Sequence, residues 1–231
     1  MKLCCVAAIT LLLLAGCGEG EAPAAQPSAK ASASPLPEVP VMGREVRIVA
    51  LGDSLFAGYG LRRGESYPAK LETALRARGI NARIANAGVS GDTSAGGLER
   101  LAFTLRSQQQ PPELVIISLG GNDLLRGLPP AQTRTNLEAI LSELQRREIP
   151  AVLMGLLAPP NLGGEYRAQF DAIYPALAKK YDAGLVPFFL SAVAGKPDLV
   201  QQDHIHPTAV GIEEIVAATV DEVAGAVKAP V

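Results

Sequence analysis

The sequence has little of several residue types, and each shortage restricts the structures or functions that the chain can have. Its only three cysteines, Cys4, Cys5 and Cys17, lie at the start of the 231 residues. The part of the chain that follows can therefore form no disulfide and must derive its stability from a hydrophobic core. Neither sign of charge dominates, since the net charge is -2, and this argues against nucleic acid as a partner. Only two histidines are present, His204 and His206, so chemistry that needs a histidine depends on one of them.

The first 40 residues have the pattern of an export signal followed by a spacer. Met1-Lys2 precedes an apolar run over 3–15, and small residues follow it, as in a secretory signal. The run is shorter than the roughly 20 residues that a membrane-spanning helix needs. From Gly18 to about Pro40 the chain is mostly Ala, Pro, Ser, Gly and Glu, a composition typical of a solvated tether.

Leu14-Ala15-Gly16-Cys17 resembles the lipobox of bacterial lipoproteins. The resemblance implies cleavage before Cys17, acylation of Cys17 and attachment to a membrane through this lipid anchor. In such lipoproteins an Asp after the cysteine favours retention at the inner membrane, so Gly18 at this position implies anchoring in the outer membrane. An ordinary signal peptide is the alternative. We therefore expect a signal peptide at 1–16, a lipidated Cys17 with a tether at 17–43, and a folded domain at 44–231.

From about residue 44, strand-like apolar runs alternate with segments of helical period. The expected strands are 46–51, 82–87, 114–119, 151–157 and 185–190, and the expected helices are 68–78, 94–107, 130–147, 166–181 and 207–227. Pro68, Pro130 and Pro207 are each expected in the first turn of a helix, where proline is tolerated best. The alternation predicts an α/β fold, a three-layer α/β/α sandwich around a five-stranded parallel sheet. Ligands bind such sheets beyond the carboxyl ends of the strands.

Three polar, glycine-rich turns follow the first three expected strands and so share one edge of the sheet. They are Gly52-Asp53-Ser54-Leu55, Gly88-Val89-Ser90-Gly91-Asp92 and Gly120-Gly121-Asn122-Asp123. A fourth polar segment near the C-terminus, Asp203-His204-Ile205-His206-Pro207, contains both histidines.

These four segments, in this order, resemble those of the SGNH hydrolases, also called the GDSL family. The resemblance is strongest to the bacterial periplasmic thioesterase, lysophospholipase and arylesterase branch, and it runs from about residue 46 to the last helix. It implies a flavodoxin-like fold and a serine esterase that hydrolyses carboxylic esters or thioesters. Acyl esters, lysophospholipids, acyl-CoA thioesters and aryl esters are the expected substrates. The family mechanism needs no cofactor and no metal.

Carried over residue by residue, the resemblance makes Ser54 the nucleophile, His206 its base and Asp203 the residue that orients His206. The oxyanion hole is then expected from the backbone N–H groups of Ser54 and Gly91 and the side-chain amide of Asn122. His204 is the weaker candidate for the base, because the family places its histidine three residues after the aspartate.

The residues after Asn122 are expected to form a loop that shapes an acyl-chain groove, through Leu124, Leu125, Arg126 and Gly127. Leu124 departs from the glycine that is usual in the resembling enzymes, which leaves the preferred chain length open. Asp53 and Asp123 are expected to brace their own turns by local hydrogen bonds rather than to bind a metal.

Two other functions remain open. The same site could transfer an acyl group to, or deacetylate, envelope carbohydrate, and a non-catalytic lipoprotein could bind lipid or glycan in the groove. The presence of Ser54, Asp203 and His206 together favours an enzyme. We expect a monomer whose partners are a small acyl ester or lipid substrate and the membrane.

Overall fold

The structure is a computed structural model, and it describes residues 41–227. The predicted signal peptide, the predicted lipidation site at Cys17 and the predicted tether as far as residue 40 lie outside the described residues. Regular structure begins at Val46. No helix within the described range is both long and apolar enough to cross a bilayer.

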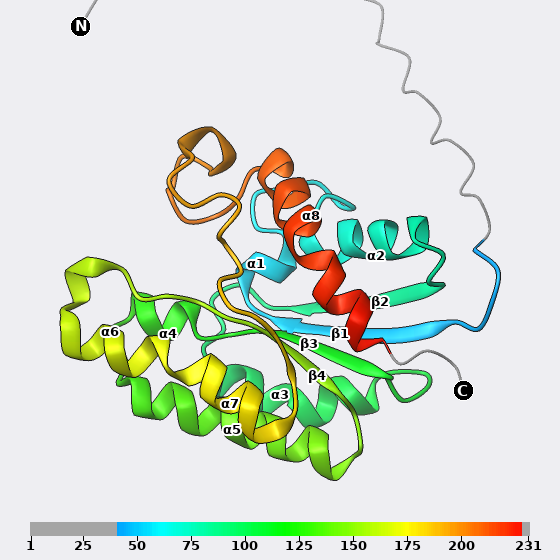
Figure 1. Ribbon diagram of the computed structural model, residues 1–231, viewed down its shortest axis with the longest axis horizontal. Coiled ribbons are helices and arrows are strands. Elements are labelled where there is room, and N and C mark those ends of the chain that lie inside the picture. Colours follow the sequence, from blue (N-terminus) through cyan, green and yellow to red (C-terminus); the bar gives the residue numbers. More distant parts are fainter. Residues whose placement is uncertain (1–40, 228–231) are drawn as a thin grey trace, which may run out of the picture. The chain divides into compact units, whose positions relative to one another are not determined.

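Five parallel strands form one sheet in the order β2-β1-β3-β4-β5 (Figure 1). The strands are β1 (Val46–Gly52), β2 (Ala82–Gly88), β3 (Leu114–Ser118), β4 (Ala151–Met154) and β5 (Gly184–Val186). In the register of the sheet, Gly52 at the end of β1 pairs with Gly88 of β2 and with Ser118 of β3. Strands β1, β2 and β3 therefore end level, and the polar turns that follow them come together at one edge.

Helices cover both faces of this sheet. Helices α2 (Tyr67–Ala77) and α8 (Ala209–Ala226) pack together on one face, and α3 (Ser94–Arg106), α5 (Pro130–Arg146) and α7 (Ile173–Tyr181) lie on the other (Figure 1). The remaining elements are α1 (Ser54–Ala57), α4 (Gly121–Leu125), α6 (Gly164–Asp171) and the 3-10 turns η1 (Pro160–Leu162) and η2 (Pro197–Leu199). This arrangement confirms the predicted three-layer α/β/α fold.

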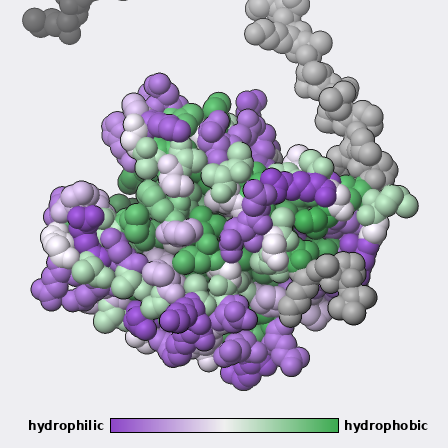
Figure 2. Space-filling model, in the orientation of Figure 1, coloured by the Kyte–Doolittle hydropathy of each residue, from purple (hydrophilic) through white to green (hydrophobic). Residues whose placement is uncertain are grey.

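The core lies between the sheet and the helices on each face. Every residue of β3 and β4 is buried, because helices pack on both faces of these central strands. The outer surfaces of the covering helices are largely hydrophilic, and hydrophobic side chains gather between the layers (Figure 2).

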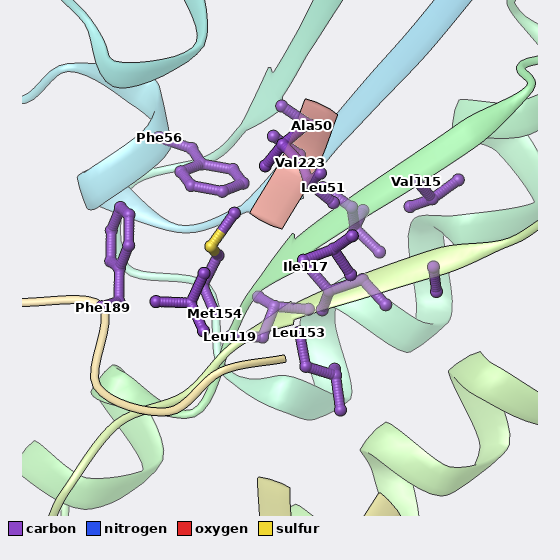
Figure 3. Close-up of a cluster of buried hydrophobic side chains, with 14 of the residues drawn as sticks. Ala50, Leu51, Phe56, Val115, Ile117, Leu119, Leu153, Met154, Phe189 and Val223 are labelled. Atoms are coloured by element: carbon purple, nitrogen blue, oxygen red, sulfur yellow. The ribbon is translucent and has the colours of Figure 1, made fainter. Parts of the chain in front are cut away.

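Aromatic packing fixes the position of α1, the short helix at the carboxyl edge. Phe56 of α1 is fully buried; its ring stacks on that of Tyr67, with centroids 5.3 Å apart, and meets the edge of Phe189 at 5.8 Å. Figure 3 shows Phe56 and Phe189 close together, with Met154 beside them. Because Ser54 begins the same helix, the core holds the segment that carries Ser54.

Two strands are shorter than the sequence predicted. Strand β4 ends at Met154 rather than at residue 157, and β5 spans only Gly184–Val186 rather than 185–190. Pro187, which follows β5 directly, has no N–H to continue the ladder. The chain then turns away from the sheet, and the N–H of Phe189 bonds to the carbonyl of Gly155.

Helix boundaries also differ from the predictions. The single helix expected over 166–181 is two helices, α6 and α7, which meet at Ala172. Pro175 explains the break, because its ring clashes with the carbonyl group four residues earlier, that of Asp171. Pro207 lies before α8 and not in its first turn, since α8 begins at Ala209 and the Thr208 hydroxyl caps it by accepting the N–H of Gly211.

Candidate active site

Ser54 lies directly beyond the carboxyl end of β1, at the first position of α1. Asp53 caps this helix, since its Oδ1 accepts the N–H of Leu55 at 3.0 Å, as the sequence predicted for a local brace. Its backbone N–H bonds to the carbonyl of Ser118 at the end of β3. A Cβ on Gly88 would lie 2.3 Å from the backbone N of Ala57, so only glycine lets the end of β2 approach α1 this closely. Contacts with the ends of β2 and β3 therefore fix the backbone around Ser54.

The structure brings Ser54, His206 and Asp203 into one chain of hydrogen bonds, although Ser54 and His206 are 152 residues apart. The His206 Nε2 atom lies 2.7 Å from the Ser54 Oγ, and its Nδ1 lies 2.6 Å from the Asp203 Oδ2. Because an ionised carboxylate only accepts, Nδ1 carries the proton, and the lone pair of Nε2 faces the Ser54 hydroxyl.

The Asp203 carboxylate is held by three N–H groups of its own loop. Its Oδ1 accepts the backbone N–H groups of His206 at 3.0 Å and Ile205 at 2.9 Å, beside the bond of Oδ2 to the imidazole. These bonds, that of the His206 backbone first, lower the pKa of Asp203 from 3.8 to about 2. Asp203 is therefore ionised throughout the neutral range. The other histidine, His204, is exposed, with a left-handed backbone at φ 60°. His206, and not His204, faces Ser54.

Asn122 and Gly91, the two remaining candidates for the oxyanion hole, lie on neighbouring segments of the same edge. Asn122 is in α4, and its Nδ2 donates to the backbone carbonyl of Asp92 at 2.9 Å. Gly91 lies in the turn between β2 and α3 with φ 85°, and its carbonyl accepts from the Arg126 Nη2 at 2.7 Å. The segments that carry Gly91 and Asn122 are therefore linked to each other twice.

Asp123 differs from the prediction of a local brace. Its carboxylate is fully buried and accepts the backbone N–H of Ser94 at 2.7 Å, the hydroxyl of Ser94, and the hydroxyl of Thr133 at 3.1 Å. These partners belong to α3 and α5, so Asp123 fixes α4, and with it Asn122, to two long helices.

Asp53, the residue before Ser54, has a carboxyl group with a raised pKa. Burial raises the pKa of its carboxyl from 3.8 to about 6, against the opposing effects of the Leu55 N–H and of the charge of His206. Its Oδ2 lies 3.5 Å from the Asn122 Nδ2. Asp53 thus precedes the nucleophile in the chain and lies near the Asn122 amide.

Arg100, which the sequence reasoning did not single out, also braces this edge. Its Nε donates to the Asp92 Oδ2 at 2.6 Å and its Nη2 to the carbonyl of Gly52 at 2.8 Å. Nothing in the sequence around Arg100 marks this role, because both partners come from other segments of the chain.

The four residues predicted to shape the acyl groove do not form a plain loop. Leu124 and Leu125 belong to α4, and only Arg126 and Gly127 follow it. Leu124 is half-buried, whereas Leu125 is 61% exposed. This helix gives Leu125 a fixed place at the edge that carries Ser54.

Exposed apolar side chains gather at the carboxyl edge of the sheet. Tyr59 follows α1, Leu125 ends α4, and Ile205 lies between Asp203 and His206; all three are large hydrophobic side chains in the exposed class. Val89 after β2 and Leu157 after β4 are also exposed. A separate hollow of about 1040 Å³ lies beside Arg44, Val46 and Leu114, near the opposite ends of the strands, and is remote from Ser54.

The described residues offer no ready-made metal site. Across 41–227, no group of three or more His, Cys, Asp or Glu side chains is placed to hold a metal ion. The carboxylates of Asp53 and Asp123 accept hydrogen bonds from backbone and hydroxyl groups instead.

Comparisons with known proteins find relatives of this chain in both sequence and structure. The sequence model of the GDSL-like Lipase/Acylhydrolase family matches residues 50–213. Esterase TesA of Pseudomonas aeruginosa is 41% identical over 160 residues, which cover 69% of this chain and 79% of that protein. Thioesterase 1/protease 1/lysophospholipase L1 of Escherichia coli K12 is 42% identical over 160 residues, which cover 69% and 74%. The crystal structure of AlinE4, an SGNH-hydrolase family esterase, shares 68% identity at a TM-score of 0.69 and covers 81% of this chain and 100% of its own.

Proposed function

The chain belongs to the GDSL-like lipase and acylhydrolase family and is an ester hydrolase, and from this premise we propose that it works through an acyl-enzyme on Ser54. His206 is the general base and Asp203 orients it. The observation that carries the proposal is the continuous chain from the Asp203 Oδ2 through the imidazole to the Ser54 Oγ, with steps of 2.6 and 2.7 Å. Such a chain converts a weakly nucleophilic hydroxyl into an effective one at neutral pH.

Acylation begins when the Ser54 Oγ attacks the carbonyl carbon of the substrate and its proton passes to the His206 Nε2. The imidazolium that results is stabilised by the Asp203 carboxylate at Nδ1. The carbonyl oxygen becomes negatively charged and is met by the N–H groups of Ser54 and Gly91 and by the amide of Asn122. When the tetrahedral intermediate collapses, the bond to the leaving alcohol or thiol breaks, and His206 returns its proton to that group.

Deacylation repeats these steps with water as the nucleophile. His206 takes a proton from the water, whose oxygen attacks the acyl carbon on Ser54. The bond to the Ser54 Oγ breaks and the hydroxyl recovers the proton, which leaves a free carboxylic acid.

The substrates are carboxylic esters and thioesters with an apolar acyl group. The exposed side chain of Leu125, at the edge that carries Ser54, supports this class. We place the acyl chain along Leu124, Leu125, Arg126 and Gly127. Relatives are named esterase, thioesterase, lysophospholipase and arylesterase, and the acyl-enzyme route serves each of these reactions.

The chain is exported and anchored in the outer membrane of the cell envelope through a lipid on Cys17. The sequence Leu14-Ala15-Gly16-Cys17, with Gly18 after it, supports this proposal. Mass spectrometry of the membrane-bound protein should find the acyl groups on the first residue of the mature chain. A Cys17→Ser variant should lose them and appear in the soluble fraction; wild-type protein without acyl groups would contradict the anchor.

A fluorophosphonate probe tests the central assignment. The wild-type protein should be labelled on Ser54, and Ser54→Ala should lose both labelling and activity on a short acyl ester. Ser90→Ala is the matched control, because Ser90 is an exposed serine on the same edge. Asn122→Ala should still be labelled, with turnover lower by about 10²-fold. Full activity in Ser54→Ala would reject the acyl-enzyme.

A further inference from the structure

The ring of Tyr59 lies against the imidazole of His206. The ring centroids are 4.5 Å apart and the planes are inclined by 32°, so the π face of Tyr59 covers one face of the imidazole. The two ring nitrogens point elsewhere in the imidazole plane, Nδ1 to Asp203 and Nε2 to Ser54. Tyr59 therefore contacts His206 where neither hydrogen-bond partner does.

Backbone and side-chain hydrogen bonds hold Tyr59 in this place. Its N–H bonds to the carbonyl of Ser54 at 3.2 Å, which fixes it to the turn that ends α1. Its own carbonyl accepts from the Gln201 Nε2 at 2.8 Å, and the same Nε2 donates to the carbonyl of Pro207 at 2.9 Å. The backbone N–H of Gln201 bonds to the carbonyl of His206 at 2.7 Å. Gln201 thus joins the Tyr59 turn to the His206 loop.

The neighbouring glycine supports this interpretation of the brace. A Cβ on Gly60, whose φ is 72°, would lie 2.2 Å from the Gln201 Oε1. The turn after Tyr59 is therefore shaped to admit the Gln201 side chain. Core packing does not explain the place of the ring, because Tyr59 is 53% exposed. A large aromatic ring is thus kept at the surface, against one particular partner.

We infer that Tyr59 is a positioning residue that stabilises the protonated form of His206 through its π face and keeps the imidazole in line with Ser54. The inference rests on the proposed role of His206 as the base. When His206 takes the Ser54 proton it becomes a cation, and a cation over an aromatic face within about 6 Å of the centroid is stabilised by the ring quadrupole. The charged and titratable groups about His206 are Asp203 in its own loop, the buried Asp53 at the start of α1, and Tyr59 itself.

Variants at residue 59 distinguish the effect of the π face on catalysis from the effect of the size of the ring. A cation–π contact at an exposed site is worth a factor of about 2 to 5. Tyr59→Leu, and replacement of Tyr59 by pentafluorophenylalanine, should lower kcat by that factor. Pentafluorophenylalanine keeps the shape of the ring but reverses its quadrupole. The acid limb of the profile of kcat/KM against pH should move to lower pH by about 0.4 to 0.7 unit in both variants.

Tyr59→Phe is the matched control, since it keeps the π face and loses only the hydroxyl. It should match the wild type within about twofold, with no movement of the acid limb. KM for a short acyl ester should stay unchanged in all three variants, because the ring acts on His206 and not on the substrate. If Tyr59→Phe behaves like Tyr59→Leu, or if the acid limb of the pentafluorophenylalanine variant stays in place, the inference is overturned.

A further variant keeps this result distinct from a failure of the proposed function. His206→Gln should remove activity whatever residue occupies position 59. Wild-type turnover in His206→Gln would reject His206 as the base and the inference with it. An inactive His206→Gln beside unaltered Tyr59→Leu would reject the inference alone. Thermal unfolding of each variant checks that the fold is retained, as expected for an exposed side chain.

Discussion

Replacing Asp53 by asparagine should make the stability of this protein less dependent on pH. Asp53 is 2% exposed, and burial raises the pKa of its carboxyl from 3.8 to about 6. Asparagine has nearly the same shape and can still accept the Leu55 N–H, so the variant removes the charge and keeps the helix cap. The effect to be measured is the difference in unfolding free energy between Asp53→Asn and the wild type.

The sign follows from which state binds the proton more tightly. A folded-state pKa above that of the unfolded chain means that the folded protein takes up a proton first as the pH falls. Above about pH 6 the carboxylate is ionised in both states, and its burial destabilises the fold by about 3 kcal/mol, from about two pKa units at 1.36 kcal/mol each. This destabilisation shrinks as the pH falls through about 6 and is gone below about 3.8, where both states are protonated.

Urea unfolding of both proteins at about pH 8 and about pH 4.5 measures this effect. The unfolding free energy of Asp53→Asn minus that of the wild type should be larger at the higher pH than at the lower pH, by about 2 kcal/mol. Asp198→Asn, which removes an exposed carboxylate, controls for the loss of one charge and should show no such difference. Asp203 has the opposite effect, because its lowered pKa stabilises the fold above about pH 4 and this stabilisation is lost toward pH 2. Both proteins retain Asp203, so its effect cancels in the comparison. A difference between Asp53→Asn and wild type that is the same at both pH values would refute the reasoning.

Three further substitutions have defined outcomes. Asp203→Asn should lower kcat by about 10²- to 10⁴-fold in steady-state assays, because an amide N–H facing Nδ1 selects the wrong tautomer of His206. Leu125→Ser should raise KM for long acyl esters about fivefold and leave acetate esters and the melting temperature unchanged, since the side chain is 61% exposed. Gly88→Ala should destabilise the fold by about 1 to 3 kcal/mol in urea unfolding and also lower kcat, because its Cβ would displace the backbone at Ala57, in the helix that carries Ser54.

The parts of the fold that the sequence predicted are those set by local pattern. Strand β3 is recognisable because Leu114 to Ser118 is a continuous apolar run rich in β-branched residues, and the structure buries all of it. The meeting of the three polar turns follows from parallel pairing, since Gly52, Gly88 and Ser118 are in register. Residues that follow such strand ends can be placed together from sequence alone.

What the sequence did not predict depends on contacts between distant segments. Asp123 was expected to bond within its own turn, but its carboxylate reaches Ser94, 29 residues away. The Tyr59 carbonyl meets Gln201 across 142 residues, and no periodicity or motif records such a pair. The break between α6 and α7 is different, because Pro175 was visible in the sequence and its clash with the preceding turn could have been anticipated.

The Asn122 amide shows how these distant contacts prepare the proposed oxyanion hole. One N–H of Nδ2 is used by the Asp92 carbonyl at 2.9 Å, whereas Asp53 Oδ2 is 3.5 Å away, too far for a strong bond to the second N–H. The first contact fixes the plane of the amide, and Asp123 fixes the helix on which Asn122 lies. The second N–H is therefore available to a developing oxyanion without first breaking a strong bond. Donors that are oriented before the reaction need no reorganisation in the transition state, which is the condition for large electrostatic stabilisation.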